Sequence, residues 1–344
     1  MKKTLKFAAV FSALSAFAEP VADFTIPYDS VRIEYSLIDD LAEIKRIEKE
    51  KKKAQKKLES KEKKAEKKKE QKAYTIPEPV HKDIGLSGLD KKPVKKFLDY
   101  YLSAEGRTKL ADVLFASEEY RIYIREQLEK RKMPLFLQYL PIVESEYKTK
   151  ALSVSGAAGL WQFMENSMSP FLKKSEFYDE RFDPWIETDA ALSKLMDNYN
   201  MFGNWELALA AYNMGAGAVK RIRKESQADF WMLAELELLS SQASLYVPKL
   251  IAITEAVENA DWYGAIEIGI ADKVIEGKKP ERFGKIKITG TITLEKIAEK
   301  SGIKLELLEK LNPALTKGCT PPDEPWTLRV PVGKAKEIAD SLRK

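Results

Sequence analysis

The chain has 344 residues, with 58 lysines and arginines against 53 acidic residues, one histidine and one cysteine. This length suggests about two domains. The lone histidine, His81, excludes a site built on several imidazoles, and the lone cysteine, Cys319, excludes an internal disulfide or a thiolate zinc site. Catalysis would therefore have to use carboxylates, hydroxyls, amides or lysines, and we expect neither a metal nor a cofactor.

The N-terminus has the pattern of a secretory signal peptide. Lys2 and Lys3 precede a mostly apolar run that ends in the small-residue pattern Ala16-Phe17-Ala18. We predict a cleaved signal over residues 1–18 and hence an exported protein of the periplasm or cell envelope. The alternative is a short amphipathic N-terminus of a cytosolic protein. The apolar run is too short to span a bilayer.

A lysine-rich segment follows an N-terminal stretch at 19–44. Residues 45–72 hold 15 basic residues against six glutamates, a net charge of +9, whereas the whole chain is only +5. The positive charge thus belongs to one low-complexity stretch, predicted over 45–73, and nucleic acid is not expected as a partner. We interpret this stretch as a solvated, partly helical spacer, because it has almost no apolar face. An electrostatic contact of residues 45–72 with an anionic envelope surface is the alternative.

The rest of the chain has the pattern of two folded units. After a proline-containing linker at 74–88, apolar residues recur with helical period over 89–262, which predicts an all-α domain of several short helices. A second linker is predicted at 263–284. Residues 285–333 then show a β-α-α-β order, followed by a tail at 334–344. The predicted fold class is mainly α with a small mixed module, and we expect a monomer.

The first segment of candidate chemistry is the apolar run from Pro134 that ends in Glu144 and Ser145. A carboxyl group after such a run is poorly solvated, and a helix C-terminus disfavours its anion. Both effects raise its pKa, as a general acid working near neutral pH requires. Taken alone, a glutamate in this position is more often a surface residue at a helix end.

Two further segments carry polar groups beside small residues. In 155–163, Gly159 allows close approach of a ligand, Trp161 offers a stacking face and Gln162 offers an amide for sugar groups. In 210–215, a helix ends at a glycine and presents Tyr212 and Asn213. In isolation, the former is more often a tight turn with a core tryptophan and the latter a helix cap.

Together, Glu-Ser, Gly-Leu-Trp-Gln and Ala-Tyr-Asn-x-Gly resemble the catalytic domain of the lytic transglycosylases of peptidoglycan, of the membrane-bound murein transglycosylase D type. The resemblance covers residues 89–262 and implies a goose-type, lysozyme-like all-α fold. Residues 285–333 resemble a LysM carbohydrate-binding module, through Thr293-Leu294, Leu311-Asn312-Pro313 and Leu328-Arg-Val330-Pro331. The implied partner is the peptidoglycan glycan strand.

The resemblance also implies a mechanism. Glu144 would protonate the β-1,4 bond between N-acetylmuramic acid and N-acetylglucosamine, and would then deprotonate the muramyl C6 hydroxyl to close a 1,6-anhydro ring. Because the substrate supplies the nucleophile, no second carboxylate at a fixed spacing is required. Ser145 would form a hydrogen bond with Glu144 or with the acetamido group of the sugar. Substrate contacts are implied for Ser145, Gly159, Trp161, Gln162, Tyr212, Asn213 and Tyr246.

Two other functions remain open from the sequence. A hydrolytic muramidase would admit water and use Asp183 as its second carboxylate. A wall-binding scaffold with an inert cleft would need no acid at all. The presence of Glu144, Gln162, Tyr212 and Asn213 argues against the scaffold, and the chemical end of the product separates the other two.

Overall fold

The structure is a computed structural model that describes residues 32–35, 49, 52–53 and 78–343. The predicted signal peptide at 1–18 lies outside the described residues. So do most of the segment 19–44 and most of the lysine-rich spacer at 45–73.

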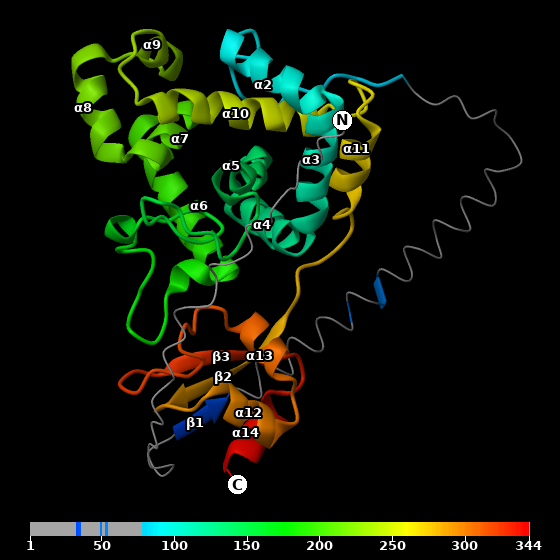
Figure 1. Cartoon of the computed structure of the whole chain (residues 1–344), viewed down its shortest axis with the longest axis vertical. Helices are drawn as coiled ribbons and strands as arrows, with labels where there is room; N and C mark the ends of the chain where they lie inside the picture. The colour runs from blue at the N-terminus through cyan, green and yellow to red at the C-terminus, as the bar shows by residue number, and fades with distance from the viewer. Residues whose placement is uncertain (1–31, 36–48, 50–51, 54–77, 344) are drawn as a thin grey trace, which may run out of the picture.

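The described residues form a helical unit and a small mixed unit, one above the other in Figure 1. The helical unit consists of α2 Lys92–Leu102, α3 Ala104–Ala116, α4 Glu118–Arg131, η2 Leu135–Tyr139, α5 Leu140–Ser145, η3 Glu165–Ser167, η4 Glu180–Phe182, α6 Pro184–Phe202, α7 Trp205–Met214, α8 Ala216–Ser226, α9 Phe230–Glu235, α10 Ser241–Glu258 and α11 Ile266–Lys273. The mixed unit consists of β1 Arg32–Tyr35, β2 Phe283–Thr289, α12 Leu294–Ser301, α13 Leu305–Leu311, β3 Trp326–Pro331 and α14 Ala335–Arg343. The predicted mainly α fold with a small β-containing C-terminal module is confirmed.

The boundaries of the helices that carry the site are encoded locally. Helix α6 begins where the Asp183 side chain accepts the N–H groups of Trp185 and Ile186, and it ends at Gly203 in the left-handed conformation. Helix α7 begins where Asn204 accepts the N–H of Leu207, and it ends at Gly215. Because α7 stops there, its last turn presents side chains at a defined place.

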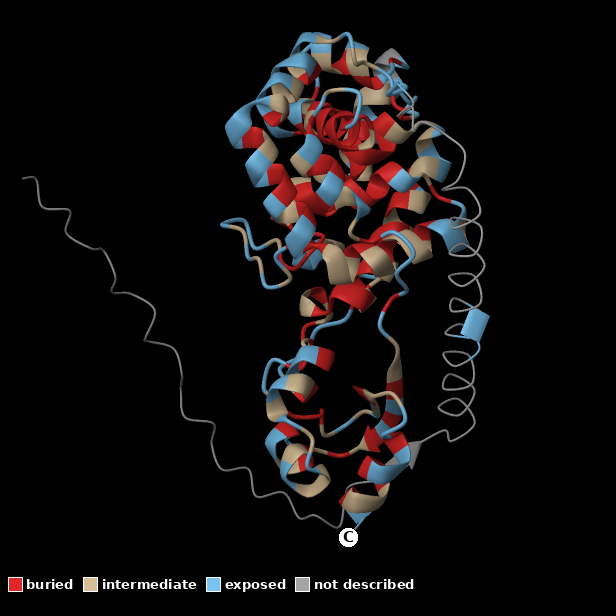
Figure 2. Cartoon of the chain, turned by 90° about the vertical axis from the view of Figure 1, so that its right-hand side faces the viewer, coloured by how far each residue is buried: buried red, intermediate tan, exposed pale blue. Residues whose placement is uncertain are grey.

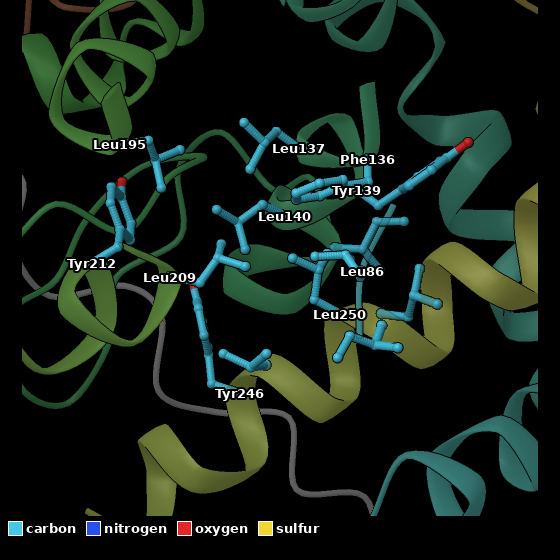
Figure 3. Packing of buried hydrophobic residues seen from close by; sticks show 14 of the residues in the cluster. Leu86, Phe136, Leu137, Tyr139, Leu140, Leu195, Leu209, Tyr212, Tyr246 and Leu250 are labelled. Atoms are coloured by element: carbon cyan, nitrogen blue, oxygen red, sulfur yellow. The ribbon is translucent and has the colours of Figure 1, made fainter. Parts of the chain in front are cut away.

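Helix α10 lies at the centre of the helical unit, packed against α2 and α7. Leu250 on α10 lies in one fully buried cluster with Leu140 of α5 and Leu209 of α7 (Figure 3). Figure 2 shows buried residues concentrated inside this unit and exposed residues on its outside. The helix runs through Pro248, although a proline inside a helix usually kinks or ends it. This packing fixes α5, α7 and α10 relative to one another.

Two segments expected to be a linker (263–284) and a tail (334–344) each contain a helix. Residues Ile266–Lys273, inside the stretch expected to be a linker, form helix α11, which packs against α3 with Ile268 and Ala271 buried. Residues Ala335–Arg343, expected as tail, form helix α14, whose Ile338 and Leu342 belong to the core of the mixed unit. In α14 the apolar residues recur with helical spacing and cover the core. In α11 only one face does so, because Ile266 and Ile270 are exposed.

The mixed unit is built on a three-stranded antiparallel sheet in the order β1-β2-β3. Ile286 of β2 lies opposite Leu328 of β3, and both side chains are fully buried under helices of the unit. The β2-α12-α13-β3 order agrees with the predicted pattern, while α14 and β1 add to it.

A loop of the helical unit inserts into the mixed unit. The Tyr178 ring is buried in the core of the mixed unit, 4.8 Å from the Trp326 ring between centroids, and its hydroxyl donates to Glu324 at 2.8 Å. Next to it, the Asp179 N–H donates to the Ala314 carbonyl at 2.9 Å. The two units are therefore joined by a packed interface as well as by the chain.

Candidate active site

A cavity of about 710 Å³ opens in the helical unit between α5, α6, α7 and α10. Glu144 lies in its wall at the C-terminal end of α5. Further lining residues come from the loop after α5 and from the facing helices, among them Gln162, Lys194, Tyr212, Asn213, Tyr246 and Lys249. The cavity thus combines one carboxyl group with amides, phenols and ammonium groups.

Glu144 is held in place by Tyr246 of α10, whose hydroxyl donates to its carboxylate oxygen Oε1. Burial raises the pKa of Glu144 to about 7, and it does so against the hydrogen bond from Tyr246 and the charges of Lys194 and Lys249, which lower it. A carboxyl group with a pKa near 7 is protonated in a large fraction of molecules at neutral pH. It can therefore donate a proton and take one back.

The polar loop beside Glu144 is a tight hairpin. The Ala158 and Phe163 backbones pair in both directions at 3.0 Å, and the turn between them places Gly159 and Gln162 at positive φ. The side-chain N–H of Gln162 donates back to the Gly159 carbonyl at 2.9 Å. The hairpin thus holds Gln162 at the cavity while using its amide nitrogen internally.

Glu187 of α6 holds this hairpin from inside, a role that the sequence analysis missed. The N–H groups of Leu160 and Trp161 donate to its carboxylate at 2.6 and 3.1 Å. Glu187 is fully buried, and burial raises its pKa well above the usual value. Gly159 leaves room for this arrangement, because a Cβ there would lie 1.9 Å from the Arg181 carbonyl oxygen and 2.5 Å from each Glu187 oxygen.

Lys194 of α6 lines the cavity and was also missed by sequence reasoning. Its ammonium group donates to the Ser167 hydroxyl at 3.1 Å and lies 5.0 and 5.1 Å from the ring centroids of Phe163 and Tyr212. Burial lowers its pKa. Only its helical register relative to Ala191 and Leu195, both fully buried, could have indicated an inward orientation.

The structure brings five of the eight predicted site residues to the cavity: Glu144, Gln162, Tyr212, Asn213 and Tyr246. Tyr212 and Tyr246 project from α7 and α10 in Figure 3. The Tyr212 hydroxyl donates to the Trp161 carbonyl at 3.0 Å and so supports the hairpin as well.

The other three predicted residues do not line the cavity. Trp161 is fully buried and its indole N–H donates to Thr188 at 2.9 Å, so the expected stacking face is not available to a sugar. Ser145 is buried and its hydroxyl donates to the Leu160 carbonyl at 2.8 Å. Ser145 therefore donates to the hairpin backbone and not to Glu144, and it does not line the cavity. Position 159 requires glycine because of its positive φ and the close approach of the Arg181 carbonyl oxygen.

Asp183, the second carboxylate of the alternative muramidase reading, is also not in the cavity. Its side chain caps α6 and pairs with Arg329 of β3, with Nη2 to Oδ1 at 3.1 Å, and it is 1% exposed. The Arg329 guanidinium lies over the Trp185 ring at 5.0 Å. Asp183 therefore joins the two units and has no access to a substrate in the cavity.

Within the described part of the chain, no group of three or more histidine, cysteine, aspartate or glutamate side chains is arranged to hold a metal ion. The helices described also include none with the length and apolar content needed to cross a membrane.

Comparison with protein families assigns both units. Residues 122–230 match the Transglycosylase SLT domain, a segment that contains Glu144, the hairpin and α7. The chain carries a transglycosylase SLT domain. Residues 282–344 match the LysM-like domain of lytic transglycosylase MltD, so the expected pairing of a transglycosylase domain with a LysM-like module is confirmed. That match includes α14, which we expected to be a tail.

Relatives extend the similarity beyond the SLT domain. The chain is 31% identical over 243 residues to membrane-bound lytic murein transglycosylase D of Escherichia coli K12, covering 69% of this chain and 51% of the relative. The same protein from an Escherichia coli O6:H1 strain matches with the same identity and coverage. The chain therefore spans about half the length of these relatives.

A solved structure, the 70 kDa soluble lytic transglycosylase SLT70 from Escherichia coli, overlaps with a TM-score of 0.35 and 20% identity, over 56% of this chain and 36% of that one.

Proposed function

We propose that this protein is a lytic transglycosylase that cleaves the β-1,4 bond between N-acetylmuramic acid and N-acetylglucosamine in peptidoglycan without using water. The observation that carries the proposal is a single carboxyl group, Glu144, with a pKa near 7 in a cavity of the helical unit. Glu144 lies within the segment that matches the SLT domain. Among the described residues that line this cavity there is no second aspartate or glutamate. A hydrolase that uses two carboxylates would need one.

The reaction would proceed in two proton transfers by the same group. Protonated Glu144 donates to the glycosidic oxygen while the muramyl C1–O bond breaks and positive charge develops at C1. The resulting carboxylate then takes the proton of the muramyl C6 hydroxyl while that oxygen attacks C1, which closes the 1,6-anhydro ring. Glu144 ends protonated and no water is consumed.

The neighbouring groups suit these steps. Tyr246 donates to the carboxylate and so stabilises the anion between the two transfers. Asn213 and Gln162 offer polar groups to sugar substituents at the cavity wall, with Tyr212 beside them. We propose substrate positioning as the role of these three residues, while Ser145, Gly159 and Trp161 act through the shape of the hairpin.

The catalytic unit would extend over 89–262, and the LysM-like module would bind the glycan strand. The relatives' name, which includes "membrane-bound" and "murein", supports an exported protein acting in the cell envelope. We also propose a signal peptide at 1–18, an electrostatic contact between residues 45–72 and an anionic envelope surface, and a monomeric state.

Product analysis tests the function directly. The purified full chain is incubated with isolated sacculi, and the soluble muropeptides are examined by mass spectrometry. We expect 1,6-anhydromuramyl ends, and a loss of about 10²–10⁴-fold in their release for Glu144→Gln. Glu146→Gln is the matched control, because Glu146 lies two residues away and pairs with Lys109 and Lys148. Reducing ends alone, or equal release by Glu144→Gln, would refute the mechanism.

A further inference from the structure

Lys249 is an ammonium group at the cavity that takes no part in either of the two proton transfers described above. It lies on α10 three residues after Tyr246, so the two side chains share a face of the helix about 5 Å apart along its axis. Lys249 is half-buried and lines the same cavity as Glu144. Among the described residues it has no hydrogen bond and no ion pair.

The acids and cations nearby are already engaged. Glu146 pairs with Lys109 at 3.3 Å and with Lys148 at 2.8 Å. Lys194 donates to Ser167 and lies against two aromatic rings. An ammonium group carries three N–H donors, and those of Lys249 are directed to no acceptor in the described residues.

The cavity is also cationic as a whole. Two lysines and one carboxyl group line it among its described residues, and that carboxyl group is neutral in its acid form. A partly desolvated positive site of this kind attracts an anion more strongly than an exposed lysine does. The chemistry that fits is a carboxylate, which an ammonium group binds through charge-assisted hydrogen bonds.

We propose that Lys249 forms a subsite for a carboxylate carried by the muramyl side of the glycan, close to the bond that Glu144 cleaves. This inference rests on the proposed function, because that function brings a muramyl unit into the cavity. The carboxylate has two chemical sources: the lactyl group of a strand without stem peptides, or the peptide attached to that lactyl group. Lys249 would thus determine which strands are bound best, while leaving the proton transfers to Glu144.

Binding measurements on full-length protein in the Glu144→Gln background test the subsite without turnover. Three soluble glycans are compared by calorimetry: one with stem peptides, one denuded with free lactyl carboxylates, and one denuded with those carboxylates converted to neutral methylamides. The variants are Lys249→Gln, which removes the charge, and Lys249→Arg, which keeps it. Lys148→Gln is the control, since it removes an exposed charge that pairs with Glu146 just after the C-terminal end of α5.

We expect Lys249→Gln to raise the Kd about tenfold or more on at least one carboxylate-bearing glycan, and several-fold less on the methylamide glycan. Lys249→Arg should restore most of the affinity, and the glycan that shows the larger loss identifies the source of the carboxylate. An equal loss on all three glycans, or no loss on any, would overturn the subsite. The product assay of the wild type tests the proposed function separately, because it detects 1,6-anhydromuramyl ends and does not depend on the Kd of any glycan. Anhydro ends together with unchanged Kd values would overturn the subsite alone.

Discussion

The hydroxyl of Tyr246 donates to the carboxylate of Glu144, joining two helices that lie about a hundred residues apart in the chain. The contact sets the geometry of the proposed acid and opposes the effect of burial on its pKa. It also connects the cavity to α10, the helix that packs against α2 and α7 at the centre of the helical unit. The reactivity of Glu144 is therefore coupled to the core of the domain.

The pH dependence of activity follows from the pKa of about 7 at Glu144. The first step needs the protonated form, so kcat/KM should fall about tenfold per pH unit once the pH exceeds this value. Release of muropeptides measured from pH 5 to 9 checks this. Glu146→Gln should leave the alkaline limb where it is, and a flat profile across neutral pH would contradict the assignment.

The stability of the fold should depend on pH through the same group. The pKa of Glu144 rises from 4.5 to about 7 on folding, so the folded state binds more protons between these values and the free energy of unfolding falls as the pH rises through them. The loss is at most about 3 kcal/mol, and less where water in the cavity solvates the anion. Urea titrations at pH 5 and 8 should show a smaller difference for Glu144→Gln than for the wild type.

Tyr246→Phe removes the hydrogen bond that lowers the pKa of Glu144, so the alkaline limb should move to higher pH. The anion between the two proton transfers also loses a donor, and we expect kcat to fall about tenfold or more. Tyr212→Phe is the matched control, since its hydroxyl donates to the Trp161 carbonyl and not to Glu144. A limb that moves equally in both variants would show that the effect is indirect.

Gly159→Ala should destabilise the SLT domain by about 3 kcal/mol or more, because its Cβ would lie 1.9 Å from a backbone oxygen and φ is +88°. Gly156→Ala is the matched comparison. It has a φ of +86° but no atom within 4 Å of its Cβ, and should cost about 1 kcal/mol. Chemical unfolding of the two variants separates crowding from backbone strain, and equal losses would refute the crowding argument.

Arg329→Ala should destabilise the protein by about 3–5 kcal/mol, because it leaves Asp183 buried without its cation. Lys334→Ala, which removes an exposed pair with Glu337, should change the stability by less than about 1 kcal/mol. Thermal unfolding and limited proteolysis of both variants check this. If the two variants behaved alike, Asp183 and Arg329 would not hold the units together.

The sequence predicts those parts of the site that depend on local pattern. Glu144 follows an apolar run along a single segment, and Asn213 precedes a helix-ending glycine by two positions, so both could be found without the fold. Asp183 could also have been interpreted correctly, since an aspartate before a proline is a typical start of a helix. Its capping of α6 is the local part of its role.

The remainder depends on contacts between distant segments. Trp161 is directed inward because the hairpin turns at Gly159 and Gln162. The Thr188 hydroxyl of α6 accepts a hydrogen bond from the Trp161 indole N–H. Glu187 is significant only because the hairpin returns to it. The spacing of these residues in the sequence does not predict which side of the turn faces the cavity.

The Tyr178 ring, which comes from the helical unit and is buried in the core of the mixed unit, has a consequence for how a glycan strand would be approached. A module tied to its partner by a buried ring and a buried ion pair cannot swing on a tether. The separation and angle between the LysM-like module and the cavity are then set by this interface. If both the cavity and the LysM-like module bind glycan as proposed, the protein would bind best those strands that can contact both sites at the same time.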